Sequence, residues 1–179
     1  MKILFFSDIH GITNNLNIID KKIKEKHIDS LICLGDLYET YSFKPDSHVS
    51  PKEVLNFLNN YKNILTCMKG NCDTLYDISM SPFNIYSGFK EINIEGRRFF
   101  ITHGNIYNMF NDSIMEKGDI LIFGHEHTPY IKERDGKTFI NVGSISLPRN
   151  NSNPSFAIYE NGRVTIYDVY DNMIGSVEV

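Results

Sequence analysis

The chain lacks the features that mark membrane proteins and secreted proteins. No segment approaches the roughly 20 apolar residues that a membrane-spanning helix needs. The apolar run 3–6 gives way to Asp8 and His10, too early for a signal peptide. The cysteines Cys33, Cys67 and Cys72 have spacings that match neither a zinc ribbon nor a disulfide framework. We therefore expect a protein of the reducing cytoplasm without a membrane partner.

An excess of basic charge is also missing. The 179 residues carry a formal net charge of -4, and the lysines and arginines do not gather into one long run. Such a chain repels a polyphosphate backbone, so long nucleic acid is not expected as a partner. A small phosphorylated substrate fits better, because a bound metal ion would dominate the local field. The length and the 41% hydrophobic content suit one folded domain over residues 1–179.

Hydrophobic patterning predicts an α/β protein whose two halves differ. In the first half strands and helices alternate: strand 3–6, helix 14–27, strand 30–34, a helix from Pro51, and strand 63–68. The second half reads as hairpin 89–101, helix 106–115, strand 120–123, and hairpins 130–141 and 156–170. This order predicts two packed sheets with helices outside them. Mobile loops are expected at 38–50 and 75–87, and the tail 171–179 carries no distinctive signal.

Five predicted strands end in short polar clusters that contain metal-ligand residue types. The clusters are Asp8 with His10, Asp36, Asn71, His103, and His125 with His127. Strand ends on one edge of a sheet converge, so these residues can surround one centre. Three oxygen donors and four imidazoles suit two borderline ions such as Mn, Fe, Zn or Co. Asp36, alone in its cluster, is the candidate bridge between them, and neighbouring glycines permit sharp turns and close approach.

The blocks Asp-x-His, Gly-Asp, Gly-Asn-x-Asp, His-Gly and Gly-His-x-His, in this order from Asp8 to His127, resemble the calcineurin-like metallophosphoesterase superfamily. The Gly-Asn-Cys-Asp variant and the segment 141–149 resemble its small prokaryotic phosphodiesterase branch. The resemblance implies a four-layer α/β/β/α sandwich. It implies one metal held by Asp8, His10, Asp36 and His127, and a second held by Asp36, Asn71, His103 and His125.

By the same resemblance, the expected reaction is hydrolysis of small phosphate esters, diesters before monoesters, by a hydroxide shared between two divalent transition metals. Manganese is favoured, with nickel, zinc and iron as alternatives. The residues expected to carry catalysis are Asn71, Cys72, Asp73 and His103, with Asp73 orienting a neighbour. Many members have a histidine where this chain has Cys72, and a thiol is a poor acid at neutral pH. Esters with good leaving groups, aryl or nucleotide, are then favoured, unless Cys72 only fills the cleft wall.

Each residue also has a plainer interpretation. Asp8 and His10 can cap the following helix, Asn71 can hold a left-handed turn, and His103 can be an ordinary half-buried histidine.

His27 and His48 are expected at the surface, and Cys33 and Cys67 in the core. Glu126 can repel anionic substrates or face solvent. Arg149 can steer a phosphate or simply be solvated. The aromatic residues Tyr38, Tyr41, Phe43 and Tyr76 can stack on a base or form a contact in a homo-oligomer.

Two other functions remain open on these residues. A nuclease or cyclic-nucleotide phosphodiesterase would use the same centre, although the acidic charge disfavours a long strand. A scaffold subunit would keep the fold and use its surface for partners, but such a relative is expected to have lost metal ligands. All seven candidate positions here hold suitable residues.

Overall fold

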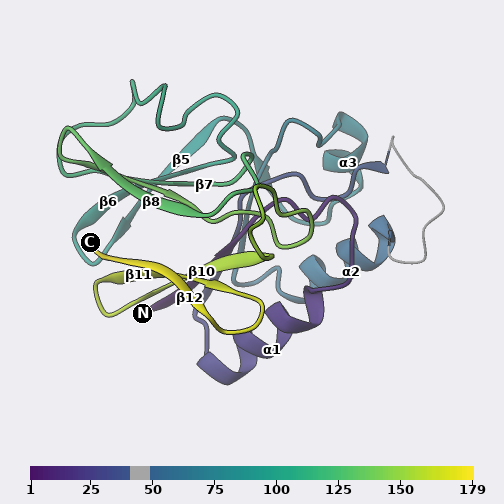
Figure 1. The fold of residues 1–179 in the computed structure, drawn as a ribbon. Coiled ribbons are helices and arrows are strands. Elements are labelled where there is room, and N and C mark those ends of the chain that lie inside the picture. The colour runs from purple at the N-terminus through teal and green to yellow at the C-terminus, as the bar shows by residue number, and fades with distance from the viewer. Residues whose placement is uncertain (41–48) are drawn as a thin grey trace.

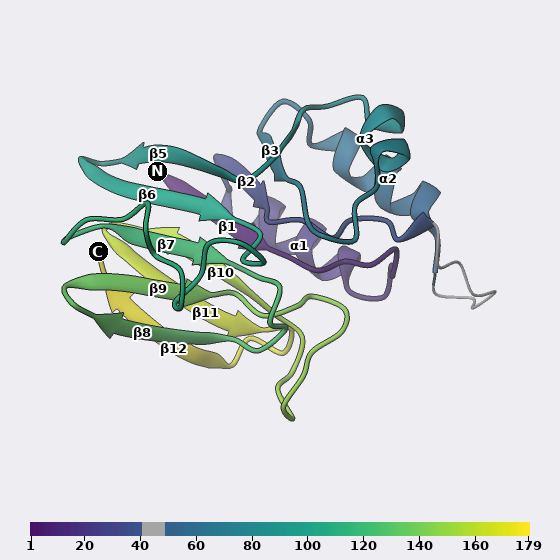
Figure 2. The same ribbon diagram turned by 90° about the horizontal axis from the view of Figure 1, so that it is seen from above.

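Two β-sheets stacked face to face organise the computed structural model, which describes residues 1–40 and 49–179 (Figures 1 and 2). The seven-stranded sheet contains, in order, β12 (Met173–Glu178), β11 (Arg163–Asp168), β10 (Ser155–Glu160), β1 (Lys2–Phe6), β2 (Ser30–Cys33), β3 (Leu65–Met68) and β4 (Ile85–Tyr86). The five-stranded sheet contains, in order, β5 (Phe89–Ile94), β6 (Arg97–Thr102), β7 (Ile120–Phe123), β9 (Lys137–Asn141) and β8 (Tyr130–Arg134). The predicted α/β class and its two mixed sheets are confirmed.

Parallel pairing sets the place where ligands can gather. β1, β2 and β3 are parallel neighbours in one sheet, and β6, β7 and β9 are parallel neighbours in the other. Their carboxyl ends therefore meet at one edge of each sheet, where polar residues follow the buried strands. Antiparallel β10, β11 and β12 extend the first sheet on the opposite side of β1.

Apolar side chains fill the space on both faces of the seven-stranded sheet. Ile3 and Phe5 of β1 face the five-stranded sheet and pack with Phe99 and Ile122. Leu4 and Phe6 point the other way, toward α1 (Leu16–Lys26) and α2 (Pro51–Asn60), as the period of two in a strand requires. Figure 1 shows these helices on the side of that sheet that faces away from the five-stranded sheet. Cys33 and Cys67 are both fully buried in this layer, as predicted.

The predicted helix 106–115 is wrong, because this segment forms a chain of turns. Asn108 donates from its side chain to the Gly104 carbonyl and accepts from the Phe110 N–H. Asn111 donates to the Ile106 carbonyl. Asparagine side chains that bond to nearby backbone compete with helical hydrogen bonds. The segment still covers the outer face of the five-stranded sheet, where Met115 packs on a small apolar cluster.

Two elements lie where the sequence offered little signal. α3 (Leu75–Met80) occupies part of the predicted loop 75–87, and a capping box between Thr74 and Asp77 starts it. β12 lies in the tail 171–179, because pairing with β11 supplies hydrogen bonds that local pattern does not reveal.

Most of the predicted loop 38–50, with Tyr41, Phe43 and His48, lies outside the described residues. Among the helices of the described part, none is long and apolar enough to span a bilayer.

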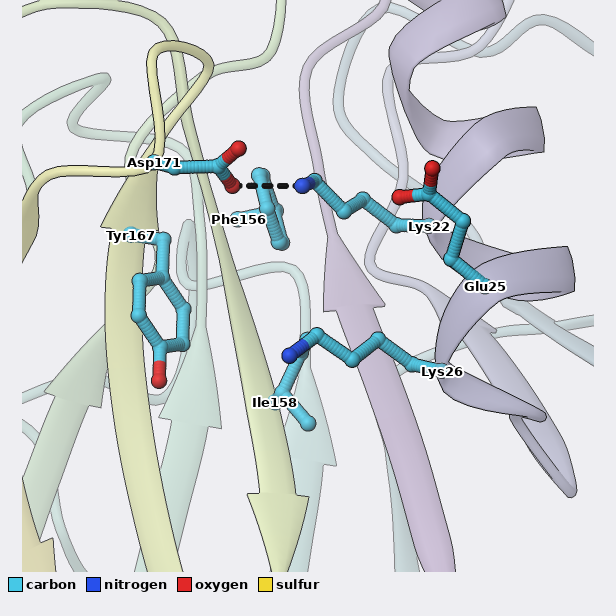
Figure 3. Close-up of a pocket in the computed structure, with 7 residues that line it drawn as sticks. All are labelled: Lys22, Glu25, Lys26, Phe156, Ile158, Tyr167 and Asp171. Atoms are coloured by element: carbon cyan, nitrogen blue, oxygen red, sulfur yellow. Dashed lines mark ion pairs between the residues drawn. The ribbon is translucent and has the colours of Figure 1, made fainter.

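A pocket of about 290 Å³ lies between α1 and the strands β10 and β11, and none of the residues that line it is a candidate ligand (Figure 3). Its floor is apolar, with Phe156, Ile158 and Tyr167. Lys22 extends across it and its Nζ lies 2.5 Å from Asp171, which is 64% exposed, while the Lys22 side chain is only 8% exposed. The ion pair therefore ties α1 to the turn between β11 and β12.

The fold predicts that Asp171→Asn costs more stability than Lys22→Met. Removing the carboxylate leaves a buried ammonium without its partner, and we expect the free energy of unfolding to fall by about 0.5 to 1 kcal/mol, a small value because Asp171 is exposed. Lys22→Met keeps the apolar stem and removes the buried charge, so a smaller change is expected. Urea unfolding measures both, and a larger loss in Lys22→Met would contradict the role given to the ion pair.

Candidate metal centre

The structure brings all seven candidate ligands to the shared edge of the two sheets. Five of these side chains are buried: Asp8, His10, Asp36, His103 and His127. Asn71 is exposed and His125 is half-buried. The group therefore has a closed side, at Asp8, and a side open to solvent, at Asn71 and His125.

Asp8, His10 and His127 form the closed part of the centre. The Nε2 atoms of His10 and His127 lie 3.2 Å apart. Asp8 Oδ1 lies 3.2 Å from His127 Nε2 and 3.7 Å from His10 Nε2. The other Asp8 oxygen, Oδ2, accepts the backbone N–H of His125 at 3.0 Å. One carboxylate oxygen thus serves the backbone while the other faces the imidazoles.

Asp36 connects this part to the open part. Its Oδ2 lies 3.7 Å from His10 Nε2 and 3.3 Å from His103 Nε2, whereas its Oδ1 accepts the Cys72 N–H at 2.8 Å. Asn71 Oδ1 lies 3.0 Å from His103 Nε2. The His125 ring meets the His103 ring edge to face, with centroids 5.0 Å apart. Asp36 Oδ2 lies between the two groups, the place that a bridging oxygen would occupy.

Strained backbone aims several of these side chains. Asp8, His10, Asp36, His125 and His127 all have φ between 52° and 66°, a left-handed conformation that non-glycine residues seldom adopt. Such residues cost of order 1–3 kcal/mol each and persist where the surrounding structure holds them. The candidate ligand residues themselves, as well as neighbouring glycines, therefore make the turns at the strand ends.

Two glycines allow close approach of the loops. A Cβ on Gly70 would lie 2.0 Å from Asp36 Oδ1, and a Cβ on Gly124 would lie 2.1 Å from Ser7 Oγ and 2.5 Å from Asp8 Oδ2. Neither glycine has a positive φ. The requirement at both positions is space beside a carboxylate.

Asp73 holds two of the ligand loops together from behind. Its carboxylate accepts backbone N–H groups of Asp36, Leu37 and Gly70 at 2.9, 2.7 and 2.8 Å. Burial raises the pKa of the Asp73 carboxyl above its usual range, and the donated hydrogen bonds of Leu37 and Gly70 oppose that rise. All three of these hydrogen bonds come from backbone N–H groups, which suits the expected orienting role of Asp73.

The segment after β9 supports the centre in a way that sequence reasoning did not identify. Asn141 donates its side-chain amide to the Gly124 carbonyl at 2.8 Å, and the Ser144 hydroxyl donates to the Asp8 carbonyl at 2.8 Å. Both contacts fix the loops that carry candidate ligands. By contrast, Arg149 is exposed, and Glu126 accepts a hydrogen bond from Tyr130 at 3.0 Å.

Other candidate residues lie at different depths. Cys72 is half-buried, and its Sγ accepts from Asn71 Nδ2 at 3.3 Å and lies within 4.8 Å of ligand atoms of His10 and Glu39. Tyr38 is fully buried, so it cannot stack on a substrate, and its hydroxyl contacts Ser81. His27 is exposed at the end of α1, as predicted.

Carboxylates and imidazoles lie close together in the centre, and they shift the pKa values of one another. Burial alone raises the pKa of Asp8 and of Asp36, but the adjacent imidazoles reverse this and hold both below the usual range. Burial alone lowers the pKa of His10 and His103, but the carboxylates of Asp8 and Asp36 reverse this and raise both. Burial and the charge of His103 lower the pKa of His125.

The donor atoms fit divalent cations. The Nδ1 atoms of His103 and His127 face the carbonyl oxygens of Leu34 and Leu147 at 2.9 and 2.6 Å, so each neutral ring has its proton on Nδ1 and its lone pair on Nε2. These lone pairs face further acceptors, including Asp8 Oδ1, a buried oxygen to which no described group donates a hydrogen bond. Acceptors that face one another in a buried site need a proton or a metal cation between them. Imidazole with carboxylate suits borderline transition metals.

These shifts predict how metal stabilisation depends on pH. In chelator-treated protein, the raised pKa values of His10 and His103 give stability that is complete below about pH 6.5 and lost as pH rises through the raised values. Metal needs neutral imidazole, so added Mn²⁺ should raise the melting temperature more at about pH 8.5 than at about pH 5.5. Thermal melts with and without metal test this, and equal increments at both pH values would contradict it.

Comparison with known proteins agrees with the motifs. A profile of the calcineurin-like phosphoesterase superfamily domain matches residues 1–162. The chain is 27% identical over 176 residues to phosphodiesterase YfcE of Escherichia coli, covering 97% of this chain and 95% of that one. It is 29% identical over 192 residues to the probable metallophosphoesterase YsnB of Bacillus subtilis, covering 99% and 97%.

Solved structures give the same answer for the fold. The E. coli phosphoesterase YfcE superposes with a TM-score of 0.92 at 26% identity, covering 99% of both chains. Vps29 of Entamoeba histolytica, complexed with Zn²⁺, has a TM-score of 0.67 at 22% identity, covering 100% of this chain and 98% of that one. The chain belongs to the calcineurin-like phosphoesterase superfamily, and this membership implies that it uses divalent metal ions.

Proposed function

We propose that this chain hydrolyses small phosphodiesters with two divalent transition-metal ions, manganese before nickel, zinc or iron. Its family membership makes it a phosphoesterase; the number of ions, the metal and the diester preference are the proposal. The observation that carries it is the convergence of the Nε2 atoms of His10, His103 and His127 on the carboxylates of Asp8 and Asp36.

The candidate ligands divide into two sets that share Asp36. Asp8, His10 and His127 would hold one ion on the closed side, and Asn71, His103 and His125 the other on the open side, with Asp36 Oδ2 between them. Two bound ions supply a nucleophilic hydroxide at neutral pH and positive charge for phosphoryl oxygens. The chain's contribution is to hold donors rigidly, through left-handed turns and the contacts of Asp73, Asn141 and Ser144.

The open side is where a substrate can reach the centre. Asn71 is exposed and His125 is half-buried, whereas Asp8 has no exposed surface. Cys72 adjoins this opening, and a thiol there offers little help to a departing alkoxide. These features favour small esters with good leaving groups, and the net charge of -4 disfavours long nucleic acid.

The first test is hydrolysis of bis-p-nitrophenyl phosphate and p-nitrophenyl phosphate by chelator-treated protein, with Mn²⁺, Ni²⁺, Zn²⁺ or Mg²⁺ restored singly. We expect faster turnover of the diester with a transition metal. His127→Ala should abolish it, because this residue supplies a buried donor. His27→Ala, which removes an exposed histidine, is the matched control and should leave the rate unchanged.

The outcomes separate the competing functions. Turnover of the monoester alone would overturn the diester preference. Absence of turnover with every metal, in protein that binds metal and is folded, would favour a scaffold built on the same fold.

Replacing Cys72 tests the interpretation of the leaving group. Cys72→His should raise turnover of diesters with alkyl leaving groups by at least about 10-fold relative to aryl diesters, because general acid catalysis matters most for poor leaving groups. Cys72→Ala should keep aryl diester turnover within a few-fold of the wild-type value. A collapse of that rate in Cys72→Ala would show that the thiol itself takes part.

A further inference from the structure

The three innermost histidines are oriented by different kinds of group. His103 and His127 donate from Nδ1 to backbone carbonyls, those of Leu34 and Leu147. Among the described residues, no carbonyl accepts a hydrogen bond from Nδ1 of His10. This atom lies 3.2 Å from Oε1 of Glu39, an ion-pair contact without hydrogen-bond geometry. His10 thus faces a carboxylate, whereas the other two rings face neutral carbonyl dipoles.

We propose that Glu39 is a positioning residue whose carboxylate, beside Nδ1, favours the proton of His10 on that atom and so presents Nε2 as a metal donor. The inference rests on the proposed metal centre. With its proton toward Glu39, His10 presents the Nε2 lone pair to the side where Asp8, Asp36 and His127 lie. A carboxylate behind a ligand histidine fixes the ring and raises its basicity.

The placement of Glu39 agrees with this role. It follows Asp36 by three residues, so the same loop supplies a candidate bridging ligand and the support of another ligand. Its φ of 51° is left-handed, as are those of Asp36 and His10, so its backbone is held in an uncommon conformation. The His10 side chain is 6% exposed and that of Glu39 28% exposed, so the contact is partly shielded from water.

The test compares metal affinity in three proteins. Glu39→Gln keeps an oxygen that can accept from Nδ1 but removes the charge, and Glu39→Leu removes both. Competition between chelator-treated protein and a chromophoric chelator for Mn²⁺ gives both dissociation constants. We expect one of them to rise by about 10- to 100-fold in Glu39→Leu and by less in Glu39→Gln, with the other constant little changed.

Two further readouts separate positioning from general damage to the fold. Thermal melts should show that chelator-treated Glu39→Leu is folded at the temperature of the binding assay, as chelator-treated wild type is. The kcat of both variants at saturating Mn²⁺ should stay within a few-fold of wild type, with KM for the diester unchanged. Glu126→Gln is the matched control. Glu126 lies between His125 and His127 in the sequence, but its carboxylate accepts a hydrogen bond from Tyr130.

Each remaining outcome contradicts the inference in a recognisable way. Equal affinities in wild type and Glu39→Leu would exclude the positioning role while leaving the metal centre in place. Loss of a whole equivalent of metal in both variants would make Glu39 a ligand in its own right, since it lies with His10 and Cys72 in a group that can itself hold an ion. Failure of wild type to bind any metal would overturn the proposed function as well.

Discussion

The burial of two carboxylates beside three imidazoles is the constraint on which the rest of the structure depends. Asp8 and Asp36 are almost without exposed surface, and the oxygens that face inward meet imidazole nitrogens. A charge in such a place costs several kcal/mol unless an opposite charge or a donor accompanies it. Protons on His10 and His103 offset the cost when metal cations are absent. The pKa values of both imidazoles are therefore raised, although burial alone would lower them. Metal ions would offset it more completely, and the same atoms are available to either.

Crowding so many acceptors together requires unusual backbone, and the sheets provide the means to hold it. Left-handed φ values recur at Asp8, His10 and Asp36, and each of these residues lies just beyond a buried strand. Backbone bonds tie the first two loops to each other: Asp8 donates to the Gly35 carbonyl and His10 to the Asp36 carbonyl. The Asp73 carboxylate accepts three further hydrogen bonds from backbone N–H groups of these loops. The strain is thus spread over a network in which strands that bury Phe5 and Phe6 serve as anchors.

Sequence reasoning succeeded where metal-ligand residue types recur at the ends of several strands, and failed where tertiary context decides. Aspartate and histidine directly after buried strands predicted the convergence of the seven candidate residues, because parallel strands must end together. The segment 106–115 looked helical by its apolar spacing, yet Asn108 and Asn111 redirect the backbone into turns. Tyr38 gave no sign that it would be buried against Ser81. β12 exists only because β11 offers a partner edge. Glu39 carries no motif, since its role depends on the ring that happens to lie beside it.

The fold alone does not settle how the site is used, because one fold can carry different functions. The unequal exposure of the two halves is more informative. A centre that served only to stabilise the chain would gain by closing both halves, as Asp8 and His127 are closed. Here Asn71 and His125 leave one half open to solvent, and an open position beside a closed one is the arrangement that catalytic metal sites require. Cys72, which stands where many superfamily members have a histidine, adjoins that opening, so under the proposed function it lies on the side from which a leaving group would depart.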